Sequence, residues 1–159
     1  MNTFPRGQGY TRKFMVGGLA WLFFSLLFSG CWSAKEDAAK LAEIQSVWAR
    51  LPSYPGMQET SSSSTSGGGK ALVSKGFRSD ARYEDVKRFY VEYLERDGWK
   101  IESEKQLKDW GSDFGGYEIR FSKADLTLAI EYAGPRADYG WQYGISVSWS
   151  RWVKAALPE

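Results

Sequence analysis

The chain has 159 residues, with 21 Lys and Arg against 19 Asp and Glu, a net charge of +2 at pH 7, no histidine and one cysteine. The lack of histidine excludes Ser-His-Asp and Cys-His catalysis and His-ligated zinc or iron sites. The single cysteine excludes an intramolecular disulfide.

The first thirty residues differ in composition from the rest. Arg6, Arg12 and Lys13 supply positive charge with no acidic residue, and 14–29 then run without a charged side chain. A basic segment followed by an apolar one is typical of a secretory signal. The apolar run has 16 residues, fewer than the ~20 that cross a hydrocarbon core comfortably. We therefore predict that residues 1–30 are a signal peptide that is removed.

The end of this segment, Phe28-Ser29-Gly30-Cys31, resembles the lipobox of bacterial lipoproteins, with Phe28 where that signature usually has Leu. The resemblance implies cleavage between Gly30 and Cys31 and a lipid on the Cys31 sulfur. It also implies a protein of the bacterial cell envelope, anchored in a membrane with its domain outside the cytoplasm. The alternative is an uncleaved signal anchor that keeps the leader in the membrane.

Without residues 1–30 the chain carries 18 Lys and Arg against 19 Asp and Glu, a net charge of -1. The charges alternate along the chain and do not gather in the basic stripe that nucleic-acid binding needs, so no nucleic-acid partner is expected. The remaining 129 residues suit one domain that builds a core without disulfides.

Residues 31–52 are predicted to hold the lipidated cysteine and a tether helix. Ser33 can cap it, Pro52 ends it, and apolar residues recur at helical spacing at Leu41, Ile44, Val47, Trp48 and Leu51. The stripe is narrow, so this helix either docks on the domain or stands between the domain and the membrane. Residues 53–69 include SSSSTSGGG and predict a Ser/Gly-rich linker or a long loop.

The folded domain is predicted over 70–159. Residues 70–78 form a strand, and a helix over 81–97 follows, capped by Ser79 or Asp80 and ended by Gly98. One face of this helix is apolar and consists of Val86, Phe89, Tyr90, Tyr93 and Leu94.

Four segments of alternating polarity come after the helix. Their apolar positions are Trp99 and Ile101; Tyr117, Ile119 and Phe121; Leu126, Leu128, Ile130 and Tyr132; and Tyr143, Ile145, Val147 and Trp149. Alternation with one wet face is typical of antiparallel sheets. The fold class is therefore α+β, an antiparallel sheet of about five strands, open or curled, with one helix packed on its apolar face.

The segment Phe89-Tyr90…Leu94…Gly98-Trp99 resembles a helix-to-strand signature of small uncharacterised bacterial envelope proteins, and that family implies no activity. No Ser-x-x-Lys motif or phosphate-binding loop is present, so we predict no enzyme and no cofactor. Carboxylate catalysis or calcium binding among Asp109, Asp113 and Glu118 is the alternative to acids that are simply solvated.

Four aromatic residues fall outside the apolar stripes: Trp110, Tyr139, Trp141 and Trp152. They predict an exposed platform for a sugar ring, a peptide or a partner protein, or else they cap the open ends of the sheet. Two classes of function remain. One is a non-catalytic, membrane-anchored binding or assembly module of the envelope whose partner is a protein or a glycan. The other is a glycan hydrolase with two acids about 5 to 10 Å apart.

Overall fold

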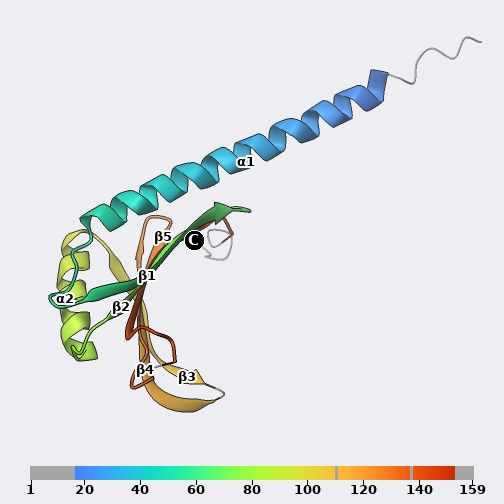
Figure 1. Ribbon diagram of the computed structural model, residues 1–159. Helices are drawn as coiled ribbons and strands as arrows, with labels where there is room; N and C mark the ends of the chain where they lie inside the picture. The colour runs from blue at the N-terminus through green and yellow to red at the C-terminus, as the bar shows by residue number, and fades with distance from the viewer. Residues whose placement is uncertain (1–16, 110, 137, 153–159) are drawn as a thin grey trace, which may run out of the picture. The chain divides into compact units, whose positions relative to one another are not determined.

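The computed structural model describes residues 17–109, 111–136 and 138–152 (Figure 1). Of residues 17–33 and Asp109 it describes the backbone alone. The chain divides into two compact units, Met1–Trp32 and Ser33–Glu159. The elements are α1 (Gly17–Arg50), β1 (Gln58–Gly67), β2 (Lys70–Arg78), α2 (Tyr83–Arg96), β3 (Lys100–Asp109), β4 (Ser112–Lys123), β5 (Leu126–Tyr132) and β6 (Tyr143–Ser150).

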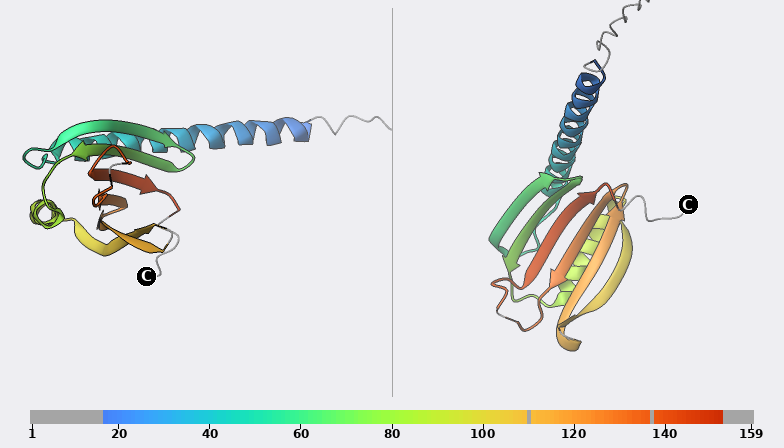
Figure 2. Two further views of the ribbon diagram at one scale, coloured as in Figure 1. Left: turned by 60° about the horizontal axis from the view of Figure 1, so that its bottom comes forward. Right: turned by 90° about the vertical axis from the view of Figure 1, so that its right-hand side faces the viewer.

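All six strands belong to one sheet, in the order β1-β2-β6-β5-β4-β3. Every neighbouring pair is antiparallel, as the alternating sequence segments predicted. The sheet curves, and α2 lies on its concave side (Figure 2). The α+β class and the antiparallel sheet are confirmed, with one strand more than the five expected.

The extra strand is β1, which occupies most of the stretch expected as a linker or long loop over 53–69. Its ten residues are all exposed, yet nine positions pair with β2. Gly68 and Gly69 close the hairpin with φ of +60° and +76°, the conformation of a two-residue turn that favours glycine. Backbone hydrogen bonds order this edge strand, and hydrophobic periodicity cannot detect them.

Residues 33–50 of α1 and the whole of α2 cover the same face of the sheet. Ile44 has 0% exposure and lies in one core cluster with Val86 of α2 and Ile145 of β6. Of the two interpretations of this N-terminal helix, docking is therefore the one observed. The compact unit begins at Ser33, so the domain boundary expected at residue 70 lies inside it.

The helix α2 starts and ends close to the predicted residues. Its N-cap is Arg82, which makes no side-chain cap hydrogen bond, so neither Ser79 nor Asp80 caps it as expected. Ser79 Oγ instead accepts a hydrogen bond from the Ala81 amide in the preceding turn. At the other end Gly98 has a φ of +82°, and Trp99 folds back to 3% exposure. Tyr83 and three of the five predicted apolar residues, Val86, Tyr90 and Leu94, are buried, and Phe89 and Tyr93 pack partly against the core.

Strand β3 is the opposite edge of the sheet and departs from its predicted pattern. Ile101, expected on the buried face, is 46% exposed. The register with β4 shifts between Ile101 and Ser103, and an inserted residue of this kind changes which face the following side chains occupy. Ile101 itself precedes the bulge and pairs with the buried Phe121, so the two side chains share a face of the sheet. Ile101 is exposed because β3 is the edge strand and has no neighbouring strand on its outer side.

Candidate functional site

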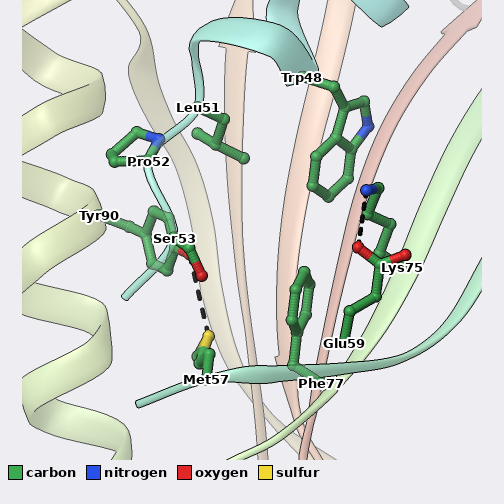
Figure 3. Close-up of a pocket in the computed structure, with 9 residues that line it drawn as sticks. All are labelled: Trp48, Leu51, Pro52, Ser53, Met57, Glu59, Lys75, Phe77 and Tyr90. Atoms are coloured by element: carbon green, nitrogen blue, oxygen red, sulfur yellow. Dashed lines mark hydrogen bonds and ion pairs between the residues drawn. The ribbon is translucent and has the colours of Figure 1, made fainter. Parts of the chain in front are cut away.

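A pocket of about 210 Å³ opens between the end of α1, the helix α2 and the β1–β2 side of the sheet (Figure 3). Both sides of this space come from the same compact unit. The residues that line it are Trp48, Leu51, Pro52, Ser53, Met57, Glu59, Lys75, Phe77 and Tyr90. Pro52 ends α1, because its ring cannot continue a helix, and the chain then turns through Tyr54 and Met57 into β1.

The wall formed by Trp48, Leu51, Met57 and Phe77 is apolar. Phe77 is 7% exposed, and the other three pack partly buried against the core. The orientation of the Trp48 indole is fixed by a hydrogen bond that its Nε1 donates to the Val73 carbonyl at 3.4 Å. A wall of this kind favours an apolar ligand group, because burial removes that group from water.

One charged group lies at the edge of the apolar wall. The Lys75 ammonium lies 2.8 Å from a Glu59 carboxylate oxygen and 5.4 Å from the centre of the Trp48 ring. Lys75 occupies the position between Val73 and Phe77 on the inward face of β2, and its β1 partner is Ser62. A lysine at an inward position of a predicted strand is the signal in the sequence that marks this site.

The Tyr90 hydroxyl is the second polar group of the pocket. It accepts a hydrogen bond from the Tyr54 amide at 3.3 Å and faces Met57 Sδ at 4.0 Å. Burial raises the pKa of Tyr90 to about 12, against a smaller opposing effect of the Tyr54 amide. Tyr90 is therefore a neutral group at physiological pH and presents a hydroxyl and not a charge to the pocket.

The size of the pocket limits what it can hold. Pockets for drug-sized ligands span about 300 to 1,000 Å³, and a cavity of about 150 Å³ accepts benzene. A space of about 210 Å³ therefore suits one ring or a short acyl segment. An ammonium at the rim adds preference for an anionic or hydrogen-bonding end.

The predicted aromatic platform is only partly assembled. Tyr139 and Trp141 stack with ring centres 5.3 Å apart. Trp152 lies against Gly69 beyond the hairpin turn, whereas Trp141 lies over Gly76 and Gly144, near the other end of β2. Trp110 lies outside the described residues. The described members of the set thus do not share one surface.

Both faces of the Trp141 ring are covered. One face lies on the Gly76–Gly144 pair, where an added Cβ would meet the ring at 3.1 to 3.3 Å. The other face carries Tyr139, whose ring in turn has the Arg136 guanidinium 4.9 Å from its centre. A ring covered on both faces caps the sheet and offers no stacking surface for a sugar.

The acids considered for catalysis lie apart from the pocket, on the solvent side of the sheet. Glu118 is 3% exposed and forms ion pairs with Lys105 at 2.9 Å and Arg120 at 2.8 Å. Burial would raise the pKa of Glu118, but these hydrogen bonds and charges outweigh it and lower that pKa. Asp113 accepts hydrogen bonds from Gln106 Nε2 and the Gly115 amide, and the Asp109 side chain is outside the described residues.

Glu131 pairs with Glu118 across β5 and β4. Burial raises the pKa of Glu131, and the charge and hydrogen bonding of Glu118 raise it further. Lys105 and Arg120 hold the Glu118 carboxylate by ion pairs, so the two acids belong to one charged cluster on this face of the sheet. The pair is a structural network of the sheet, and the described residues contain no group of three or more ligands that could hold a metal.

Among the residues with described structure, no helix has the length and apolarity that a membrane crossing requires. The predictions for Gly30 and Cys31 concern side chains outside the described set and stay predictions.

The fold and pocket together define a helix-and-sheet module with a small open pocket between its layers, which combines an apolar wall with polar groups at its edge. Residues 57–140, more than half of the chain, match the family described as START domain-like. The chain belongs to this family. A 57-residue stretch is also 42% identical to peptide chain release factor 1 of Mycobacteroides abscessus, covering 36% of this chain. The chain spans 14% of that relative's length. The solved structures gave no match.

Proposed function

We propose that this protein is a lipid-anchored component of the bacterial cell envelope whose START domain-like unit binds a small apolar molecule without catalysis. The observation that carries the binding part is the pocket between α1, α2 and the sheet, with its apolar wall and one ammonium at the rim. The lipobox-like Phe28-Ser29-Gly30-Cys31 carries the anchoring part. Two or more acyl chains anchor a protein stably, whereas one gives only marginal binding.

The pocket selects the ligand by its size and by Lys75. The apolar part of the ligand lies against Trp48 and Phe77, and a polar end displaces Glu59 from the ammonium or shares it. Glycan hydrolysis is not proposed, because Lys105 and Arg120 hold the Glu118 carboxylate by ion pairs, and Glu118 and its neighbour Glu131 lie on the opposite face of the sheet from the pocket.

Titration with octanoate tests the binding part, since its chain matches the pocket and its carboxylate matches Lys75. We expect a saturable change in tryptophan emission, because Trp48 lines the pocket. Leu51→Trp, which fills the space, should abolish binding, and Lys75→Gln should weaken octanoate but not 1-octanol. The exposed Lys100→Gln is the matched control. Equal binding to Leu51→Trp and to the unaltered protein would remove the pocket from the proposal.

Intact-mass analysis of the protein extracted from membranes tests the anchoring part. The expected mass is that of a chain beginning at Cys31 with acyl groups attached. A precursor that retains residues 1–30, or an unmodified Cys31 thiol, would refute it.

A further inference from the structure

The turn between β1 and β2 is joined to the first part of the compact unit and to the end of β6. The Gly69 amide donates a hydrogen bond to Asp37 Oδ2 at 3.2 Å, and the Gly69 carbonyl accepts one from the Arg151 amide at 2.9 Å. The Arg151 guanidinium forms an ion pair with Glu36. We call this region, made of residues 35–37, 68–70 and 151–152, the hairpin end.

Trp152 gives the hairpin end an exposed apolar side chain. An added Cβ on Gly69 would lie 3.3 Å from Trp152 Nε1, so the indole rests beside the turn. Trp152 is 63% exposed, the highest value among the large exposed apolar side chains of the described residues; Ile101 is 46% and Tyr139 44% exposed. Most of this indole surface contacts nothing within the described part of the chain.

The hairpin end also contains two lysines. Lys35 and Lys70 are both exposed, and neither forms an ion pair with a residue that the structure describes. The acidic groups of the region are engaged internally, Glu36 with Arg151 and Asp37 with the Gly69 amide. Tryptophan with lysine is the combination found at the headgroup level of membranes, because the ring is apolar with one polar edge and the cations attract anionic lipids.

The length of chain before the hairpin end restricts its distance from an anchor at Cys31. Asp37 is six positions after Cys31, and a chain of that length spans at most about 20 to 22 Å even when fully extended. Tyr139 and Trp141, in contrast, belong near the Gly76 end of β2, six residues along the strand from Lys70, or about 20 Å farther.

We infer that the hairpin end docks on the lipid bilayer, with the Trp152 indole at the level of the headgroups and Lys35 and Lys70 facing anionic lipid. The inference rests on the proposed attachment at Cys31, which brings this end of the compact unit to the surface. Docking fixes the orientation of the unit on the membrane, so that the sheet end with Tyr139 points away from it.

Quenching of tryptophan by brominated lipid tests the inference. The full-length protein is purified from membranes and reconstituted into phosphatidylcholine–phosphatidylglycerol vesicles in which the phosphatidylcholine is brominated near the glycerol end of its acyl chains. We expect Trp152→Phe to lose a distinct quenchable component of the emission. Trp141→Phe, the matched control at the other end of the sheet, should keep it. Replacing both Lys35 and Lys70 by Glu should reduce the Trp152 component.

Two results would overturn docking. One is identical quenching of the unaltered protein and of Trp152→Phe. The other is a vesicle-independent change in Trp152 emission that grows with protein concentration, which would assign this surface to a second copy of the chain. The mass of the same preparation reports separately on Cys31. A lipidated chain whose Trp152 is not quenched refutes the docking and leaves the attachment intact. An unlipidated precursor whose Trp152 is quenched refutes the attachment and leaves the docking intact.

Discussion

Replacement of Ile44 by alanine distinguishes a helix that is part of the domain from a helix that is only a tether. Ile44 lies on α1 with 0% exposure and belongs to the main core cluster. The change removes three carbon atoms, or about 2.4 kcal/mol at ~0.8 kcal/mol per buried methylene. The cavity left in a packed core adds to this, so we expect a loss of about 3 to 4 kcal/mol in the free energy of unfolding.

Urea unfolding, followed by far-ultraviolet circular dichroism, measures this loss. The midpoint should fall while the slope against urea stays unchanged, as expected when stability alone is affected. Gln45→Ala is the matched control, because Gln45 is the next residue of the same helix and is exposed; its effect should stay within about 0.5 kcal/mol. A loss below about 1 kcal/mol for Ile44→Ala would show that α1 does not contribute to the core and would refute the docked arrangement.

Four further predictions concern the sheet and its contact with α1. The pKa of Glu118 is lowered in the folded protein, so its ionised carboxylate stabilises the fold above its ordinary pKa of 4.5, and this stabilisation is lost as the pH falls through the lower folded value. Glu118→Gln should therefore lower the free energy of unfolding by about 1 to 3 kcal/mol at pH 7. The pKa of Glu131 is raised in the folded protein, so ionisation of its carboxyl group destabilises the fold, and this penalty is complete above the folded pKa. Glu131→Gln should therefore raise the urea midpoint at pH 7 but not below pH 4.5. A loss of stability at pH 7 would contradict this reasoning. Gly76→Ala would place its Cβ 2.5 Å from Ser61 Oγ and 3.1 Å from the Trp141 ring, and should lower the free energy of unfolding by about 1 to 3 kcal/mol. Gly144→Ala, whose Cβ would lie 3.3 Å from the same ring, should cost less. Equal melting temperatures of the two variants would count against the close packing of Trp141. Burial would raise the pKa of Asp125, but the hydrogen bond from Lys40 and the Lys40 charge outweigh it and lower that pKa. Asp125→Asn should therefore raise the rate of amide hydrogen exchange in residues 33–50. Unchanged exchange rates there would exclude a role for the Lys40–Asp125 pair in holding α1.

The elements that bury side chains were predicted well, because burial leaves a periodic pattern in the sequence. The apolar positions from Tyr117 to Trp149 all face the helix side of the sheet, with Tyr117 and Tyr132 partly exposed. The Gly98 turn also followed from its sequence, since few other residues adopt its positive φ.

The elements that depend on backbone pairing were not predicted. Strand β1 buries no side chain, so its serines carry no periodic signal and read as a linker. The exposure of Ile101 depends on the place of β3 at the edge of the sheet, and the bulge that follows Ile101 depends on how β3 aligns with β4; both are properties of the assembled sheet and not of one strand. The N-terminus of α2 depends on the backbone at Arg82 and on no capping side chain.

The site was missed for a related reason. Its residues come from α1, the following turn, β1, β2 and α2, and none of these segments carries a chemical motif. Trp48 and Phe77 were counted as core or strand residues, and they line one pocket because the end of α1 packs beside β2 in the folded chain. The sequence predicted an exposed aromatic platform that includes Trp141, but the Trp141 ring is covered by Gly76, Gly144 and Tyr139.

The described part of α1 links the features on which both proposals depend. Asp37 holds the hairpin turn, Lys40 forms an ion pair with Asp125, and Trp48 lines the pocket. Ile44, between them, lies in the core. A force on the chain near residue 33 therefore acts on the hairpin turn, on the core and on one wall of the pocket, because the backbone hydrogen bonds of a helix make these residues one rigid element. Anchoring and ligand binding, if both are found, are expected to depend on each other through this helix and not through a flexible linker.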